Sequence, residues 1–384
     1  MHSLFDYIAW RGDLTFCADP PNAVDSLIFC CLSYIRFSDI VPPFPSTDSI
    51  LLKDAAARFL ALPKDRRLMR TPEDEKLLEA LSDSRRFANV RLSHYADRFD
   101  HRQEKQFAAI TALLDNGDAY LAFRGTDNTL VGWKEDFNMA FLPVVAAQQD
   151  ALGYLETVAP SIPGSLIPGG HSKGGNLAVY AAARCSAALQ DRICAVYNHD
   201  GPGFHQEMMD SNGYQSILPR IRTLIPQSSI IGMLLDHEEP YTVIHSSQLG
   251  IMQHNPYTWN VLGPDFVREE NVTHTSLAID RTLKNWVASM TPEQRGDFIN
   301  GLYQIFDATD AVRISDLPKL WLRNFDQVSS AWKNTPQETR RLFFQTFSRL
   351  VDAAVKTAGQ YLPLQAYHKN CKDERLWISS NACR

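Results

Sequence analysis

The first part of the chain has apolar side chains at helical spacing. Between residues 22 and 81 they recur every three or four positions, as at Val24, Leu27 and Ile28. Thr71 is a helix N-cap residue, and Pro72 after it is suited to the first helical position. The pattern predicts a helical N-terminal section over residues 1–90.

The pattern then changes to that of a sheet. Two apolar runs, residues 107–114 and 119–123, flank Asn116-Gly117, which is a strong signal for a β-hairpin. Short apolar runs that predict further strands follow at residues 165–167, 193–197, 221–225 and 241–244. Helical segments are predicted between them at residues 176–184 and 206–214. Alternating strands and helices indicate an α/β fold, with a mainly parallel sheet covered by helices.

The last hundred residues return to helical spacing. Thr291 and Thr335 are each followed by proline and, three positions after the threonine, by Gln294 or Glu338, which is the pattern of a capping box with proline at the first helical position. We therefore expect three sections: a helical section over residues 1–90, an α/β domain over 91–285, and a helical section over 286–384.

Composition and charge exclude several classes of protein. The 38 basic and 44 acidic residues leave a net charge of −6, which argues against a nucleic-acid partner. No uncharged apolar stretch reaches the roughly 20 residues that span a bilayer, and no secretory signal is visible. The seven cysteines show no C-x-x-C spacing. We expect a cytoplasmic protein with no transmembrane segment, no metal and no cofactor.

One segment has the pattern of a catalytic nucleophile. Gly170-His171-Ser172-Lys173-Gly174 matches G-x-S-x-G, with an apolar strand before it and an Ala-rich helix after it. The sharp turn needs glycine two residues before and after the serine, because side chains there would collide. Backbone N–H groups at the helix start can stabilise an oxyanion. Ser172 is therefore the candidate nucleophile; the alternative is a glycine-rich turn without chemistry.

A second segment supplies the candidate oxyanion hole. In an α/β-hydrolase one donor is the N–H after the nucleophile, here that of Lys173, and another comes from a loop after an earlier strand. The turn Arg124-Gly125-Thr126 follows the strand at 119–123, so we expect Thr126 to provide the second donor.

These motifs resemble those of class 3 (fungal-type) lipases: a strand ending in Arg-Gly-Thr, then Trp133 and Asp136, then Gly-His-Ser-x-Gly-Gly at residues 170–175. The chain more closely resembles a bacterial, Mbeg-like family of class-3-lipase-like proteins of largely unassigned function. That resemblance rests on Tyr-x-x-Trp-Arg-Gly-Asp at 7–13, Asp-Gly-Pro-Gly-Phe at 200–204 and Gly-x-Met-Gln-His at 250–254. It implies an α/β-hydrolase fold with helical additions at both ends.

Lys173 departs from the class 3 pattern, which usually has leucine at this position. Its backbone donor is unaffected by the change. The side chain either alters which substrates are accepted or forms a surface ion pair at the start of the helix.

The remaining members of a triad should follow Ser172 in the order acid, then histidine. For the acid we favour Asp236, on the loop after the later strand, with Asp200 as the alternative. For the base we favour His254, on a loop at the same sheet edge. His274 is the alternative, because class 3 lipases bring their histidine later, before a final helix.

The predicted function is a serine hydrolase that cleaves small-molecule or lipid esters through an acyl-enzyme. A thioesterase, or a binding or scaffold protein with an idle triad, is the alternative. The apolar residues 137–145 lie where class 3 lipases carry their lid; they form either a lid or an ordinary buried element.

Overall fold

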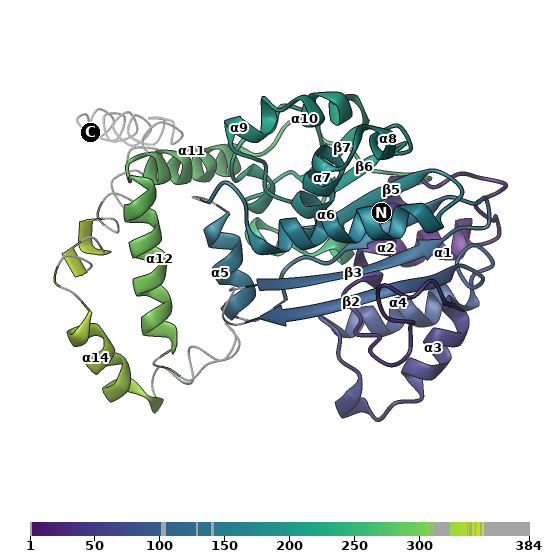
Figure 1. Cartoon of the computed structure of the whole chain (residues 1–384), viewed down its shortest axis with the longest axis horizontal. Coiled ribbons are helices and arrows are strands. Elements are labelled where there is room, and N and C mark those ends of the chain that lie inside the picture. The colour runs from purple at the N-terminus through teal and green to yellow at the C-terminus, as the bar shows by residue number, and fades with distance from the viewer. Residues whose placement is uncertain are drawn as a thin grey trace, which may run out of the picture.

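A single large sheet runs through the centre of the protein (Figure 1). The computed structural model describes residues 2–100, 105–127, 130–139, 142–307, 309, 323–335, 337, 340, 341, 343–345 and 348. The eight strands follow one another across the sheet in chain order: β1 (Ser49–Leu51), β2 (Arg91–Asp100), β3 (Lys105–Leu113), β4 (Ala119–Phe123), β5 (Leu166–His171), β6 (Val196–His199), β7 (Ile221–Pro226) and β8 (Tyr241–Ile244). Strands β1 to β4 are antiparallel and β4 to β8 are parallel, which confirms the predicted α/β fold with a mostly parallel sheet.

The predicted hairpin is formed by β3 and β4. Leu113 pairs with Ala119 at its closed end, and Gly117 takes a φ of 90°, which glycine adopts without strain. The sheet continues beyond the hairpin, because β1 and β2 add two antiparallel strands that the apolar pattern did not predict. Charged residues such as Asp97 and Arg98 interrupt the apolar run of β2.

Helices cover both faces of the sheet, because successive side chains of each strand point to opposite faces. Tyr120 and Ala122 of β4 belong to one apolar core, whereas Leu121 and Phe123 belong to the other. The first core is closed by the N-terminal helices α1 (Leu4–Arg11), α2 (Ala23–Leu32), α3 (Leu52–Leu60) and α4 (Pro72–Asp83). The second is closed by α6 (Ala146–Val158), α7 (Lys173–Arg184) and α10 (Asn212–Ile217). The N-terminal section thus shares a core with the sheet.

Several predicted elements differ in their bounds from the observed ones. Strand β6 begins at Val196, later than the predicted residue 193. The helix predicted over residues 206–214 is broken into α9 (Gln206–Met209) and α10, because the Ser211 side chain accepts from the Tyr214 N–H and caps a new helix. Helices α6 and α5 (Leu130–Asn138) were not predicted.

The C-terminal part is helical as far as it is described. Helices α11 (His274–Ala288), α12 (Pro292–Asp307) and α14 (Phe325–Asn334) follow the sheet, and α12 starts after Thr291 as predicted (Figure 1). The helix predicted after Thr335 lies largely outside the described residues. No helix in the described ranges is long and apolar enough to cross a membrane. The section boundaries near 90 and 285 and the cytoplasmic location stay predictions.

Candidate active site

Ser172 lies at a strained turn between β5 and α7. Its φ of 59° is in a region that non-glycine residues rarely adopt. A Cβ atom on Gly170 would lie 2.1 Å from the carbonyl carbon of Gly174, and one on Gly174 would lie 2.1 Å from the Phe123 carbonyl oxygen. Both positions flanking Ser172 therefore exclude any side chain, which is the constraint that the G-x-S-x-G pattern predicts.

Asp200 comes directly after β6, the strand that pairs with β5, at the same edge of the sheet as Ser172. His171 of β5 pairs in register with His199 of β6, and the Ser172 N–H donates to the His199 carbonyl over 2.9 Å. The next residues, Ser172 and Asp200, therefore emerge together at the carboxyl end of the sheet. The Asp200 carboxylate is 1% exposed, and its Oδ2 lies 2.6 Å from Nδ1 of His254.

Asp236, the favoured acid, lies in a different environment. Its side chain is 66% exposed, and its carboxylate forms an ion pair with Lys284 over 3.2 Å. The prediction that Asp236 orients His254 thus does not fit the geometry, whereas the alternative acid, Asp200, does. The loop after β7 contributes donors to Asp200 in place of an acid: the Ser229 hydroxyl over 2.5 Å and the Gly232 N–H over 3.2 Å.

The side chain of His171 holds the backbone of His254 through a hydrogen bond. His171 Nε2 donates to the His254 carbonyl over 2.8 Å, and its Nδ1 accepts from the Tyr34 hydroxyl at 3.1 Å. Burial lowers the pKa of His171 well below its usual value, so that the ring is neutral with one donor and one acceptor, as these two partners require. His171 therefore lies behind the turn and positions the backbone of His254.

The loop around His254 is also tied to the N-terminal helices. The hydroxyl of Tyr257 donates to Asp74 at the start of α4 over 2.7 Å, and Trp259 Nε1 donates to the Gln253 carbonyl over 2.8 Å. No local motif connects Asp74 or Tyr34 with this site, so sequence reasoning missed both. His274, the alternative base, begins α11 and is exposed. The histidine that contacts the Asp200 carboxylate is His254.

The turn that contains Thr126 packs directly against Ser172. A Cβ atom on Gly125 would lie 2.5 Å from the His171 carbonyl oxygen and 3.0 Å from the Ser172 Cβ. The Thr126 hydroxyl lies 2.7 and 2.6 Å from the two carboxylate oxygens of Asp136. Lys173 is the first residue of α7, where backbone N–H groups have no partner within the helix. Both candidate oxyanion donors therefore border Ser172.

The Lys173 side chain is buried, which corrects the interpretation of a surface ion pair. It is 1% exposed, and its Nζ lies 2.7 Å from Glu135 Oε2 and 3.0 Å from the Gln106 carbonyl. The ammonium is thus directed into the protein, toward α5 and β3.

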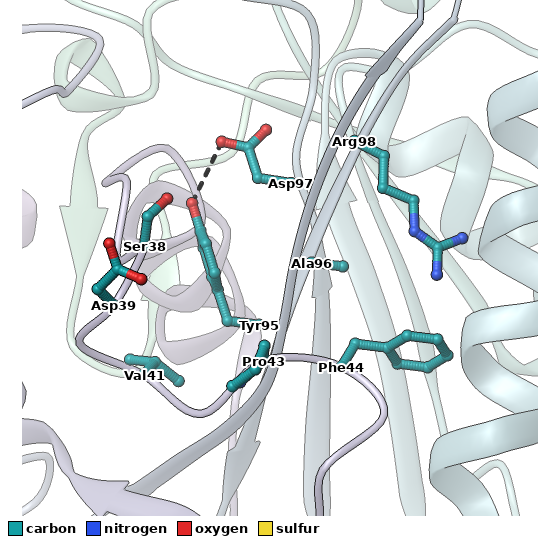
Figure 2. Close-up of a pocket in the computed structure, with 9 residues that line it drawn as sticks. All are labelled: Ser38, Asp39, Val41, Pro43, Phe44, Tyr95, Ala96, Asp97 and Arg98. Carbon is teal, nitrogen blue, oxygen red and sulfur yellow. Dashed lines mark hydrogen bonds between the residues drawn. The ribbon is translucent and has the colours of Figure 1, made fainter.

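A cavity of about 330 Å³ is lined by residues of β2 and of the loop that precedes β1 (Figure 2). Phe44, Tyr95 and Asp97 are among its lining residues, and Asp97 binds Arg124 over 2.8 Å. Its lining includes none of Ser172, His254 and Asp200. Within the described part of the chain, no group of three or more His, Cys, Asp or Glu side chains is placed to hold a metal ion.

The predicted lid is only partly described. Helix α5 ends at Asn138, residues 140 and 141 lie outside the described residues, and Val145 is buried. Leu142 and Val144 are exposed. Whether residues 137–145 move stays a prediction.

The sheet, the helices on both faces and the strand–turn–helix at Ser172 define an α/β-hydrolase fold. A family model described as Mbeg1-like matches residues 81–304, more than half of the chain. The chain therefore belongs to the Mbeg1-like family, which confirms the resemblance seen in its motifs.

The chain is also similar to solved lipase structures, at low identity and low TM-score. A Rhizomucor miehei lipase–propeptide complex is 18% identical with a TM-score of 0.33, covering 44% of this chain and 58% of that one. A triacylglycerol lipase whose catalytic centre is a serine protease triad is 16% identical with a TM-score of 0.37, covering 57% and 79%. A fungal lipase with an unusual buried polar cluster is 16% identical with a TM-score of 0.36, covering 62% and 91%. No curated protein sequence matches the chain.

Proposed function

We propose that this protein is a serine hydrolase of carboxylic esters, with Ser172 as nucleophile, His254 as base and Asp200 as the acid that orients it. The observation that supports this most strongly is the 2.6 Å contact between His254 Nδ1 and the buried Asp200 carboxylate, at the sheet edge where Ser172 emerges. A buried carboxylate next to imidazole stabilises the imidazolium that forms when the base takes a proton.

The proposed reaction proceeds in two halves. Because Nδ1 donates to Asp200, the neutral His254 ring has Nε2 as its acceptor, and Nε2 takes the hydroxyl proton as Ser172 Oγ attacks the ester carbonyl. The tetrahedral intermediate collapses when the imidazolium returns that proton to the departing alcohol, which leaves an acyl-Ser172. Water, deprotonated by His254, then releases the carboxylic acid and restores the serine.

The oxyanion of the intermediate would be held by the backbone N–H groups of Lys173 and Thr126. Removal of one such donor typically lowers kcat by about 10²–10³-fold. The close packing of Gly125 against Ser172 supports this assignment, because it brings the backbone of the turn next to the nucleophile.

The first experiment is labelling with a fluorophosphonate probe, combined with hydrolysis of p-nitrophenyl butyrate. Wild type should be labelled and Ser172→Ala should not. Asp200→Asn should lose about 10⁴ in kcat, because the amide no longer stabilises the imidazolium, and His254→Ala should be at least as impaired.

Asp236→Asn and His274→Ala are the matched controls and should keep activity within about twofold, because Asp236 is exposed and His254 already contacts Asp200. Equal labelling of wild type and Ser172→Ala, without hydrolysis by either, would instead support an idle binding or scaffold protein. Faster turnover of an acyl thioester than of its oxygen ester would identify a thioesterase.

A further inference from the structure

Lys173 is a buried cation one residue after the candidate nucleophile. Lysine is rarely buried unless it is paired, because removal of its charge from water is costly. Here the ammonium has two close acceptors, Glu135 Oε2 at 2.7 Å and the Gln106 carbonyl at 3.0 Å. The charge is therefore satisfied inside the protein.

Glu135 links this cation to three further elements. Its Oε2 also accepts from the Gln106 N–H on β3 over 3.0 Å, and its Oε1 accepts from the Ala147 N–H at the start of α6 over 2.9 Å. Glu135 itself is on α5 and 1% exposed. The Lys173–Glu135 pair therefore fastens α5, α6 and β3 to the first turn of α7.

The neighbouring carboxylate connects this pair to the oxyanion turn. Asp136 accepts the Thr126 hydroxyl at both of its oxygens, and one of them lies 3.9 Å from Lys173 Nζ. A carboxylate accepts such a bond more strongly than a neutral carboxyl group does. The position of Thr126 thus depends on the charge of Asp136, and that charge faces Lys173.

We propose that Lys173 is a positioning residue for the ester hydrolysis proposed above: its ammonium keeps Asp136 ionised, and ionised Asp136 holds the Thr126 turn at the oxyanion hole. This inference rests on the proposed function. It assigns the side chain a role separate from the backbone N–H of the same residue, which any amino acid but proline would supply.

The charges around Asp136 favour this arrangement. Its side chain keeps 28% of its surface exposed, yet loss of hydration raises the pKa of Asp136 to about 6. Lys173 opposes that rise in pKa, Glu135 adds to it, and His254 on the facing loop opposes it. An opposite charge within about 4–6 Å typically lowers a carboxyl pKa by about 1–3 units. Without Lys173, the pKa of Asp136 should therefore rise, and Asp136 should be protonated near neutral pH.

The test compares pH profiles of kcat for p-nitrophenyl butyrate in wild type, Lys173→Met, Asp136→Asn and the double variant Lys173→Met/Asp136→Asn. We expect the acidic limb of Lys173→Met to lie about one pH unit or more above that of wild type. For a rise of one unit from about 6, its activity should be about fivefold low at pH 6 and about twofold low at pH 7, and should recover toward wild type by pH 9 with KM little changed. In the Asp136→Asn background, Lys173→Met should move the limb no further.

If the acidic limbs of the kcat profiles coincide in wild type and Lys173→Met, the inference is overturned. So would a shift that persists in the Asp136→Asn background, because Lys173 would then act on His254 directly. If Lys173→Met alone fails to fold, Lys173→Met/Glu135→Gln leaves no unpaired buried carboxylate. Its limb should be displaced in the same direction but by less, because Lys173 lowers the pKa of Asp136 more than Glu135 raises it. Absence of labelling and hydrolysis in wild type would defeat the proposed function itself, which separates the two failures.

Discussion

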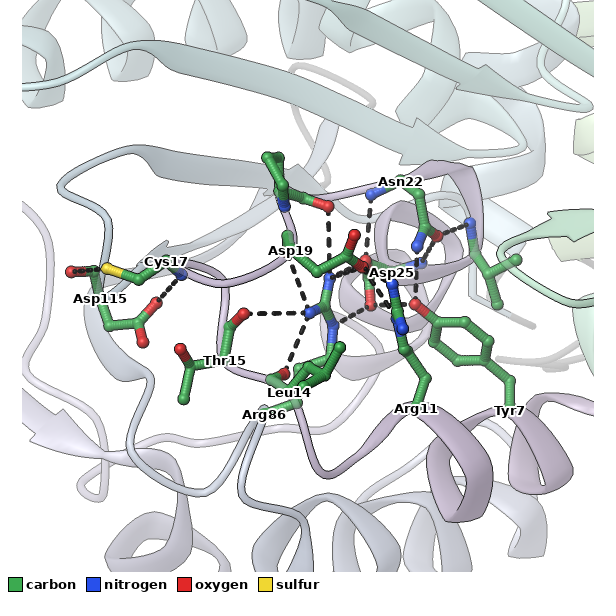
Figure 3. A network of polar contacts seen from close by, with 12 residues as sticks. Tyr7, Arg11, Leu14, Thr15, Cys17, Asp19, Asn22, Asp25, Arg86 and Asp115 are labelled. Carbon is green, nitrogen blue, oxygen red and sulfur yellow. Dashed lines mark hydrogen bonds and ion pairs between the residues drawn. The ribbon is translucent and has the colours of Figure 1, made fainter.

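Two ion pairs in this protein are equally buried but differ in their cation and in their surroundings. In the N-terminal section, Arg86 binds Asp25 through two parallel contacts of 2.8 and 2.6 Å, and both side chains are fully buried (Figure 3). Arg86 also donates to the carbonyls of Leu14 and Asp19. Beside Ser172, the Lys173–Glu135 pair is equally buried but makes a single contact of 2.7 Å.

The difference follows from the two cations. The planar guanidinium of Arg86 offers five donors, so one side chain fixes the loop between α1 and α2 as well as Asp25. The ammonium of Lys173 is a point charge, and its field reaches Asp136, which it does not bind closely. We infer that the first pair holds the fold together, whereas the second adjusts the site, and this distinction can be tested.

Removal of Arg86 should have the largest effect on stability. Arg86→Met leaves Asp25 buried without its cation, and breaking a buried pair in this way typically costs about 3–5 kcal/mol. Urea unfolding should show this loss, while kcat of the folded fraction stays as in wild type. Arg11→Met is the control: Arg11 and Asp19 are partly exposed, so less than about 1 kcal/mol should be lost. A loss of kcat in folded Arg86→Met would contradict the inference that the Arg86–Asp25 pair stabilises the fold without affecting the site.

Removal of Glu135 should have a smaller effect on stability and a distinct effect on the site. Glu135→Gln keeps a carbonyl oxygen for Lys173, which also retains the Gln106 carbonyl, so we expect a loss of about 1–3 kcal/mol. Because the negative charge of Glu135 raises the pKa of Asp136, its removal should lower that pKa. The acidic limb of the kcat profile should therefore move to lower pH, opposite to the shift in Lys173→Met. A shift of the acidic limb to higher pH would contradict the inference that the charges of Lys173 and Glu135 set the pKa of Asp136.

The features predicted correctly from the sequence depend only on residues that are close together along the chain. The turn at Ser172 needs glycines two positions away on each side, and the hairpin at Gly117 needs a short loop between two apolar runs. Strand β8 was predicted at its observed residues because its apolar run is uninterrupted by charge. Such local requirements leave a pattern that can be recognised without the fold.

The features that the sequence did not reveal depend on contacts between distant parts of the chain. Asp236 follows the later strand, as the acid of such folds commonly does, but the pairing of His171 with His199 brings Asp200 to the site. Lys173 looked exposed because a lysine at a helix start usually is, and its partner lies 38 positions earlier on a helix that was not predicted. Periodicity carries no information about which charged side chains will meet.

The smallest effect should come from Tyr7, which tests whether the N-terminal pair acts alone. The Tyr7 hydroxyl donates to Asp25 over 2.9 Å and accepts from Asn22 over 2.7 Å (Figure 3). Tyr7→Phe should cost about 0.5–1.5 kcal/mol in urea unfolding, because Asp25 keeps both contacts with Arg86. Tyr241→Phe, on a side chain 41% exposed, should change stability by less than about 0.5 kcal/mol. A loss in Tyr7→Phe as large as in Arg86→Met would show that the hydroxyl and the guanidinium stabilise Asp25 cooperatively, so that the stabilising unit is the whole network around Asp25.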